Sequence, residues 1–190
     1  MSYAMEQGPR THRITVDEFL RMAEVGLLAP DARVELIEGV IVDMVPVGTV
    51  HASDVGLIGE RFVAAVQGKA IVRVQSPVQL SDDMLPQPDI ALVKSRADRY
   101  LDKHPGPPDI LLVVEVADSS VDYDFGRKLK LYARYGVREV WILNVQTDTL
   151  HFFRSRTDVG YREEGTTKEP GILPLPSLGL TVDLSGLTRE

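Results

Sequence analysis

Two acidic residues occupy positions where an unpaired charge is costly. Asp89 follows Pro88 and opens the apolar run Asp89–Val93, and Glu115 lies inside the apolar run Ile110–Val116. A carboxylate in such a strand is unfavourable unless it is paired or bound to a metal ion. Neighbouring strands lie about 4.8 Å apart, so the two side chains could share one cation. Their positions therefore indicate a magnesium-dependent phosphodiesterase.

A hard divalent cation, Mg²⁺ or Mn²⁺, is the cofactor that these acids predict. Magnesium takes oxygen ligands and retains water, so few protein ligands suffice. We expect the carboxylates of Asp89 and Glu115 to bind it, with the main-chain carbonyl of Val116 as a third ligand. A cation held in this way activates water and stabilises charge on a phosphoryl group.

Lys128 is the candidate cationic group of the site. Asp124, Lys128 and Tyr132 are spaced by four residues, so they share one face of a predicted helix. This helix begins just after the strand that carries Glu115, and Lys128 is expected to reach a phosphate oxygen or to orient the attacking water. The alternative is an Asp124–Lys128 pair on a solvated face, with Tyr132 in a packing role.

The order and spacing of these motifs resemble the Uma2 family, which belongs to the PD-(D/E)XK (restriction-endonuclease-like) superfamily. The resemblance covers about residues 15–185 and implies a metal-dependent nuclease-type site with Asp89 and Glu115 at its two acidic positions. The superfamily usually has lysine two residues after the second acid, where this chain has Ala117. In Uma2-like sequences the lysine comes from the following helix, and Lys128 matches it. The matching segments are Val34-Glu35-Leu-Ile-Glu38-Gly39, Val74-Gln75-Ser-Pro-Val, Pro88-Asp89, Val114-Glu115-Val116, Asp124-x-x-x-Lys128-x-x-x-Tyr132 and Gly136-Val137-x-Glu139-Val-Trp141.

Glu35, Gln75 and His51 are further candidates. The resemblance implies that Glu35 is an additional carboxylate of the metal site; otherwise it is an exposed strand residue. Gln75 lies in an apolar strand and is expected to face the site and orient water or ligand, or else to be a buried, hydrogen-bonded amide. His51 opens a predicted helix and is either a phosphate or metal neighbour or an N-terminal cap.

The elements around these residues form an α/β pattern. The resemblance implies a restriction-endonuclease-like core, a central mixed β-sheet flanked by helices. A strand, helix and strand over 110–144 predict a right-handed crossover and a parallel strand pair. The Pro-rich tail after residue 170 is predicted to lack regular structure and to pack over the domain. The remaining expected elements are a helix at 15–24, a hairpin at 33–44 that turns at Glu38-Gly39, a helix at 51–66, a strand at 70–80, a helix at 119–135 and a hairpin at 149–164.

Composition limits the function classes. The 190 residues predict a flexible N-terminus, residues 1–12, and one nuclease-like domain, residues 13–190. The absence of cysteine excludes disulfides and thiolate metal sites, and no apolar run reaches the ~18 residues of a membrane span. The cytoplasm is the expected compartment. A net charge of −7 counts against easy DNA binding, which relies on Lys and Arg. The best candidates for a basic rim are residues 94–100 and Arg127, Lys130 and Arg134.

The leading hypothesis is an endonuclease that hydrolyses DNA phosphodiesters with metal-activated water. Two alternatives stay open. One is a nuclease-fold binding or regulatory module without turnover, which the acidic charge and Ala117 favour; the other is a hydrolase of a smaller phosphate ester. The resemblance also implies a homodimer that embraces a duplex. The apolar segment Leu173–Leu187 is either its interface or a wrap over the chain's own core.

Overall fold

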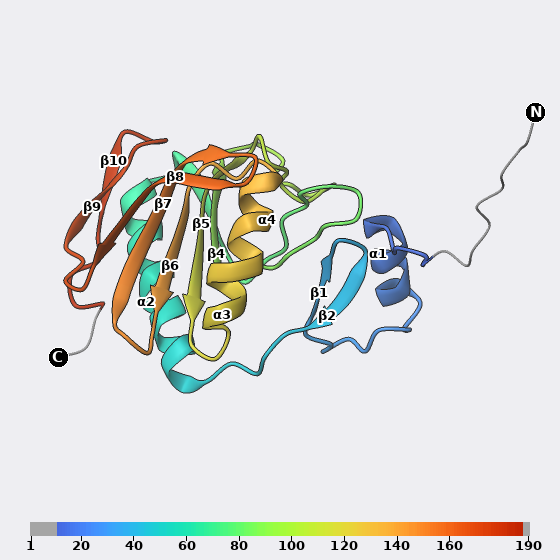
Figure 1. Ribbon diagram of the computed structural model, residues 1–190. Coiled ribbons are helices and arrows are strands. Elements are labelled where there is room, and N and C mark those ends of the chain that lie inside the picture. The colour runs from blue at the N-terminus through green and yellow to red at the C-terminus, as the bar shows by residue number, and fades with distance from the viewer. Residues whose placement is uncertain (1–10, 188–190) are drawn as a thin grey trace, which may run out of the picture.

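A six-stranded mixed sheet forms the centre of the molecule (Figure 1). The computed structural model describes residues 11–187, so the N-terminal segment that was expected to be flexible lies almost entirely outside the described residues. The strand order is β3-β4-β5-β6-β7-β8, and all neighbours are antiparallel except β5 and β6, which are parallel. The strands of this sheet are β3 (Ala70–Val74), β4 (Ile90–Lys94), β5 (Ile110–Ala117), β6 (Val140–Asn144), β7 (Thr149–Thr157) and β8 (Gly160–Thr167).

Helices cover both faces of the sheet (Figure 1). One face packs against α2 (Thr49–Val66), where Phe62 lies near the Trp141 ring. The other face packs against a helix that joins β5 to β6 and consists of α3 (Val121–Tyr123), the π-helical turn η1 (Asp124–Lys128) and α4 (Leu129–Arg134). The predicted mixed sheet with flanking helices and a parallel strand pair is therefore confirmed.

Strand β5 is apolar throughout because both of its faces are buried. Val114 and Val116 pack into the cluster that contains α2, whereas Val113 and Ala117 pack into the cluster beneath α4. Side chains alternate along a strand, so Glu115 must point to the α4 side. This alternation directs the Glu115 carboxylate towards the helix that carries Lys128.

The helix after β5 is wider in its middle than predicted. The expected helix over 119–135 begins at Val121, passes through the π-helical turn Asp124–Lys128 and ends before Gly136, whose φ is +99°. Such π-helical turns occur often at functional sites. Lys128 is the last residue of this turn and is buried.

Strand β3 is shorter than the predicted strand at 70–80. It ends at Val74, because Gln75 has a φ of +42°, which is incompatible with an extended strand. The Gln75 amide then donates to the Asp89 carbonyl at 2.8 Å. The chain reversal that ends the strand therefore also places Gln75 beside Asp89.

The prediction that the Pro-rich tail lacks regular structure is wrong. Strands β9 (Ile172–Leu175) and β10 (Leu180–Asp183) form a separate two-stranded sheet. Pro174 is tolerated because β9 has only one strand neighbour, so its missing N–H can face the free edge. Leu175 and Val182 are buried in the cluster that contains α2. The tail therefore wraps over the chain's own core.

The N-terminal elements position Glu35. Helix α1 (Val16–Glu24) starts with a capping box in which Thr15 and Glu18 exchange hydrogen bonds. Strands β1 (Val34–Ile37) and β2 (Val40–Asp43) form the predicted hairpin, with its turn at Glu38-Gly39. Leu36 of β1 bridges to Leu85, which joins the hairpin to the segment before β4. Among the described residues, no helix is long and apolar enough to cross a membrane.

Candidate active site

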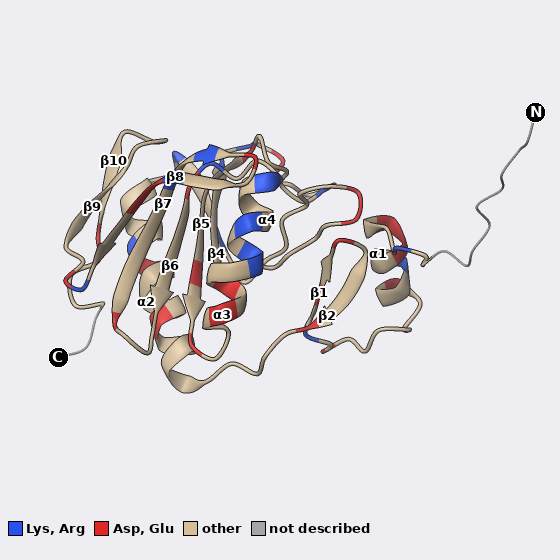
Figure 2. Cartoon of the chain, in the orientation of Figure 1, with Lys and Arg blue, Asp and Glu red and all other residues tan. Residues whose placement is uncertain are grey.

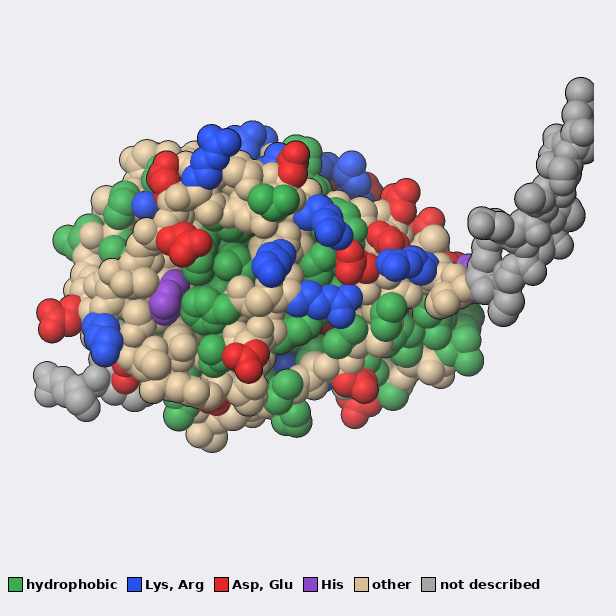
Figure 3. All heavy atoms as spheres, viewed as in Figure 1, with side chains coloured by type: hydrophobic (Ala, Val, Ile, Leu, Met, Phe, Trp, Pro, Cys, Tyr) green, Lys and Arg blue, Asp and Glu red, His purple; other side chains and the backbone are tan. Residues whose placement is uncertain are grey.

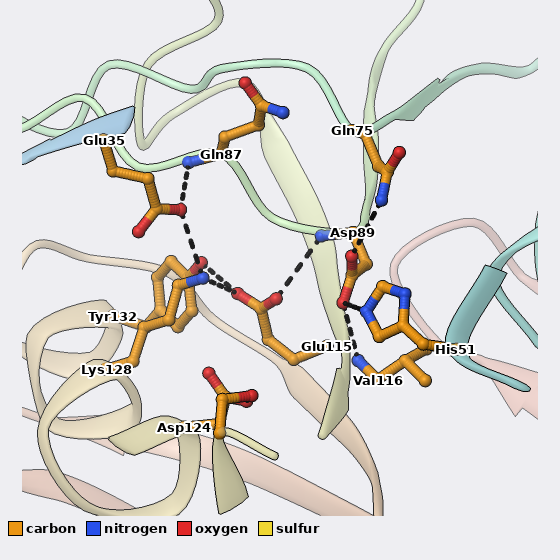
Figure 4. A network of polar contacts seen from close by, with 11 residues as sticks. Glu35, His51, Gln75, Gln87, Asp89, Glu115, Val116, Asp124, Lys128 and Tyr132 are labelled. Atoms are coloured by element: carbon orange, nitrogen blue, oxygen red, sulfur yellow. Dashed lines mark hydrogen bonds and ion pairs between the residues drawn. The ribbon is translucent and has the colours of Figure 1, made fainter. Parts of the chain in front are cut away.

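The predicted site residues meet where β4 begins and β5 ends (Figure 4). These two strands are antiparallel, with Ile90 opposite Val114, so Asp89 and Glu115 are brought to the same edge. A cavity of about 350 Å³ opens there. Of the predicted residues, its lining contains Glu35, Asp89, Glu115, Val116 and Lys128, and Gln75 lies beside it in contact with Asp89.

Asp89 is held by three donors. Its Oδ2 accepts a hydrogen bond from the Val116 amide at 2.9 Å and lies 3.1 Å from Nε2 of His51. Its Oδ1 accepts from Nε2 of Gln75 at 3.4 Å. Burial acts to raise the pKa of Asp89, but the hydrogen bond and charge of His51 outweigh it, so the pKa lies below its usual value. The hydrogen bond to Asp89 raises the pKa of His51 in turn. Asp89 is therefore a carboxylate at neutral pH.

Glu115 is fully enclosed and also has three donors. Its Oε1 lies 3.0 Å from Nζ of Lys128 and accepts a hydrogen bond from the Tyr132 hydroxyl at 2.5 Å. Its Oε2 accepts from the Asp89 amide at 3.3 Å. Burial raises the pKa of Glu115 to about 8; the charge of Lys128 opposes this rise, and the charge of Asp89 adds to it. The proton affinity of Glu115 is thus much higher than that of Asp89.

Lys128 joins two acids across the buried side of the site. Its Nζ lies 3.0 Å from Oε1 of Glu115 and 3.3 Å from Oε1 of Glu35. Burial acts to lower the pKa of Lys128, but the charges of Glu115, Glu35 and Asp124 raise it well above its usual value. The alternative of a solvated helical face is wrong, because only 7% of the Lys128 side chain is exposed. Asp124 instead accepts a hydrogen bond from the Ser120 hydroxyl at 2.5 Å.

Glu35 is buried rather than exposed, so the exposed-strand alternative is also wrong. Its Oε1 accepts a hydrogen bond from the main-chain N–H of Gln87 at 2.8 Å and a second one from Nζ of Lys128. Figure 4 shows Glu35 on the far side of Lys128 from Asp89. Glu35 is therefore joined to Glu115 through the lysine.

Two side chains have larger parts in this network than the sequence indicated. Tyr132 was given a packing role, yet its hydroxyl donates a hydrogen bond to Glu115. The spacing of four residues between Lys128 and Tyr132 was the feature of the sequence that could have indicated this role. His51 was considered a cap or a neighbour of the site. The N-cap of α2 is Gly48, and the His51 ring contacts Asp89. These partners are 38 residues apart in the chain, and no local pattern reveals such a contact.

The donor atoms fit a cation that keeps part of its water shell. Each carboxylate oxygen can accept about two hydrogen bonds, and Asp89 Oδ1 and Glu115 Oε2 each accept one. The Val116 main-chain N–H donates to Asp89. In an antiparallel pair the N–H and C=O of one residue point to the same side, so the Val116 carbonyl also points towards Asp89. Residues 11–187 contain no preassembled group of three or more His, Cys, Asp or Glu ligands. The available donors are oxygen atoms, the ligand type that hard divalent cations take.

The raised pKa of Glu115 predicts how stability depends on pH in the metal-free protein. Because the folded pKa of Glu115, about 8, lies above the usual value of 4.5, the folded state binds this proton more tightly than the unfolded state does. Its stabilising contribution is complete below pH 4.5 and is lost as the pH rises through about 8. The free energy of unfolding, measured with urea in EDTA, should therefore fall for the parent as the pH rises from 4.5 to about 8, relative to the Glu115→Gln variant. The glutamine of this variant stays neutral over the whole range. A constant difference between the two proteins would contradict the raised pKa.

Comparison with known proteins places the chain in a family. A solved structure, described as a putative nuclease belonging to DUF820 from Anabaena variabilis, has the same fold with a TM-score of 0.65 and 20% identity. The match covers 87% of this chain and 91% of that chain. No curated protein matches the chain. The family model of Uma2, described as "Putative restriction endonuclease", matches residues 16–185, from the first residue of α1 to beyond β10. The chain therefore belongs to the Uma2 family.

Proposed function

We propose that this protein is a divalent-metal-dependent endonuclease that hydrolyses phosphodiester bonds of DNA. The observation that carries the proposal is the meeting of Asp89, Glu115 and Lys128 at one cavity, although they come from two strands and a helix. An ionised carboxylate, a second acid and a buried ammonium group are what hydrolysis of a phosphodiester requires. Membership of a family described as "Putative restriction endonuclease" supports the same reaction class.

Asp89 and Glu115 would hold Mg²⁺ or Mn²⁺, with the Val116 carbonyl as the third protein ligand. The bound ion would supply Lewis-acid stabilisation of the phosphoryl group and a water of lowered pKa. His51 and Gln75 fix the orientation of Asp89 through its two oxygens. Such partners of a ligand typically change metal affinity or activity about 10- to 100-fold.

Lys128 would stabilise the negative charge that develops on the phosphate. Its ammonium group is held beside Glu115 on a buried side chain, and a preorganised charge in such surroundings acts strongly. Glu35 keeps this ammonium group in place from the other side. We therefore assign to Glu35 a positioning role on Lys128, in addition to the metal-site role that the family resemblance implies.

DNA would have to approach past an acidic cavity. Acidic residues lie along α3 and in β5, whereas Lys and Arg gather along α4 (Figure 2). Two of these cations are already engaged, since Arg127 and Arg134 contact Glu38 at 3.1 and 3.0 Å. Lys130 is exposed on the same helix. The basic rim along α4 is thus partly neutralised, and further phosphate contacts must come from elsewhere.

A substrate panel separates this function from its alternatives. We expect the purified full-length protein to nick supercoiled plasmid DNA with Mg²⁺ or Mn²⁺ and to lose this activity in EDTA. Hydrolysis of nucleotides or aryl phosphates without DNA cleavage would favour a smaller phosphate ester as substrate. Failure to cut any substrate, together with no heat of metal binding at millimolar concentration, would favour the binding module.

We also propose that residues 13–190 act as a single nuclease-like domain, that the protein is a homodimer, and that it works on DNA in the cytoplasm. Hydrophobic side chains gather on the surface around α1 and the β1–β2 hairpin (Figure 3). Exposed members include Leu27, which is 72% exposed, and Val40, which is 54% exposed. Exposed apolar patches often mark interfaces between proteins. Light scattering coupled to size exclusion should give the mass of a dimer, and a monomer mass would contradict the assembly.

A further inference from the structure

Arg73 lies near the candidate active site, on strand β3, which is the neighbour of β4 in the sheet. It is in β3, an edge strand, and pairs with Ala91, which follows Asp89 by two residues. Gln75 follows Arg73 by two residues and contacts Asp89. Alternate residues of a strand share a face, and two residues span about 7 Å. Ala91, and with it Arg73 on the neighbouring strand, therefore lies on the same face of the sheet as Asp89, about 7 Å further along.

The guanidinium group of Arg73 is partly buried and has no carboxylate partner among residues 11–187. Within residues 11–187, Arg21, Arg127, Arg134 and Arg154 each contact an acid, whereas Arg73 takes part in no ion pair. Its Nε is buried and has no hydrogen-bond partner among these residues. The side chain as a whole is partly exposed. An unpaired and partly buried cation is unfavourable, so Arg73 is available to an anion from outside.

The surroundings of Arg73 also suit an anion. The titratable groups that interact with its charge are Tyr100 and His104, and neither is a carboxylate. Burial, with a further contribution from Arg73, lowers the pKa of His104, so its ring is neutral at pH 7 and can donate one hydrogen bond. Burial also acts on Arg73 itself and lowers its pKa, but a guanidinium group stays charged in proteins.

Beyond Arg73, the same strand borders a second hollow. A groove of about 460 Å³ is lined by Ile71 and Val72 of β3 and by Arg96 and Arg99 of the loop that follows β4. Arg96 contacts Asp98, whereas Arg99 has no ion pair among the described residues. Cationic groups therefore continue along β3 away from the candidate active site.

We propose that Arg73 binds a phosphodiester of the substrate strand close to the one that is cut, so that the strand leaves the site along β3. This inference rests on the proposed function and adds a place for the substrate backbone. Arginine binds phosphate through two parallel N–H groups.

DNA binding as a function of salt tests this site without requiring cleavage. Fluorescence anisotropy would follow a labelled duplex and the full-length protein in Ca²⁺, at several salt concentrations. Each phosphate contact contributes about 0.9 to the slope of log K against log[salt]. We expect Arg73→Gln to weaken binding and to reduce the magnitude of the slope by about 0.9. Arg73→Lys should keep most of the slope because it keeps the charge.

Arg162→Gln is the matched control. Arg162 is exposed on β8, the opposite edge of the sheet, and has no ion pair among residues 11–187. The Arg162→Gln variant should bind the DNA duplex with the parent's affinity and with the parent's slope of log K against log[salt]. Arg73→Met, which keeps an apolar stem, serves as a second test if the glutamine variant does not fold.

The possible failures can be told apart. If the parent cleaves DNA but both neutral Arg73 variants bind with the parent's affinity and slope, the phosphate site is wrong and the proposed function stands. If the parent neither binds nor cuts DNA, the proposed function is wrong and this inference falls with it. In the cleavage assay, a raised KM with little change in kcat would agree with a contact to the bound strand.

Discussion

Asp89→Asn is expected to reduce metal-dependent DNA cleavage by about a thousandfold. Asp89 is the carboxylate whose pKa lies below its usual value, so it offers a negative charge to a cation at any pH near neutrality. Asparagine keeps the shape of the side chain but removes this charge. A bound metal stabilises the transition state by several kcal/mol, and about 4 kcal/mol corresponds to about a thousandfold in rate. Plasmid nicking under single-turnover conditions measures the loss.

Glu115→Gln should cause a loss of the same order, since the two acids act as a unit. Asp43→Asn is the matched control, because Asp43 also lines the cavity but shares no hydrogen bond with either acid within residues 11–187. Its cleavage rate should stay close to that of the parent. If the Asp89 and Glu115 variants cut DNA as fast as the parent, the reaction takes place elsewhere on the molecule.

Lys128→Met is expected to lower the free energy of unfolding by about 3–5 kcal/mol. The lysine contacts both Glu115 and Glu35, and all three side chains are buried. Methionine fills a similar volume but leaves two acids without their cation, and removing one partner of a buried pair is strongly destabilising. Urea denaturation in EDTA measures the change. Cleavage should also be lost.

Two further variants make this stability prediction specific. Lys130→Met changes an exposed lysine two residues away and should alter stability by no more than about 0.5 kcal/mol. The double variant Lys128→Met/Glu35→Gln should recover part of the loss, because one of the two stranded acids becomes neutral. Equal stability of Lys128→Met and the parent would mean that the buried charges compensate each other in another way.

The central part of the fold was predictable because its signals are local. The apolar runs of β4, β5 and β6 indicate buried strands, and the helix between β5 and β6 indicates the parallel pair. The positions of Asp89 and Glu115 follow from the same pattern, since each is an acid beside or within such a run. Their proximity needed one more inference, that β4 and β5 are neighbours, and the structure contains that pairing.

Features that depend on distant contacts were not predictable. The left-handed residue Gln75 ends β3 early, although the alternating pattern continues to residue 80. The π-helical turn before Lys128 has no local mark in the sequence. The tail forms β9 and β10 because its leucines and valine find the cluster around α2, which outweighs its prolines. In each case the tertiary environment decides between conformations that the local sequence allows.

A crystal structure of the full-length protein with bound manganese would test the central claim most directly. We predict an anomalous peak between Asp89 and Glu115, about 2.0–2.6 Å from one oxygen of each, the range for hard divalent cations. Nζ of Lys128 should stay at the same site, within reach of a phosphate bound to the metal ion. If these carboxylates keep their hydrogen bonds to Gln75 and the Asp89 amide, with no peak between them at millimolar manganese, the proposed metal site is wrong.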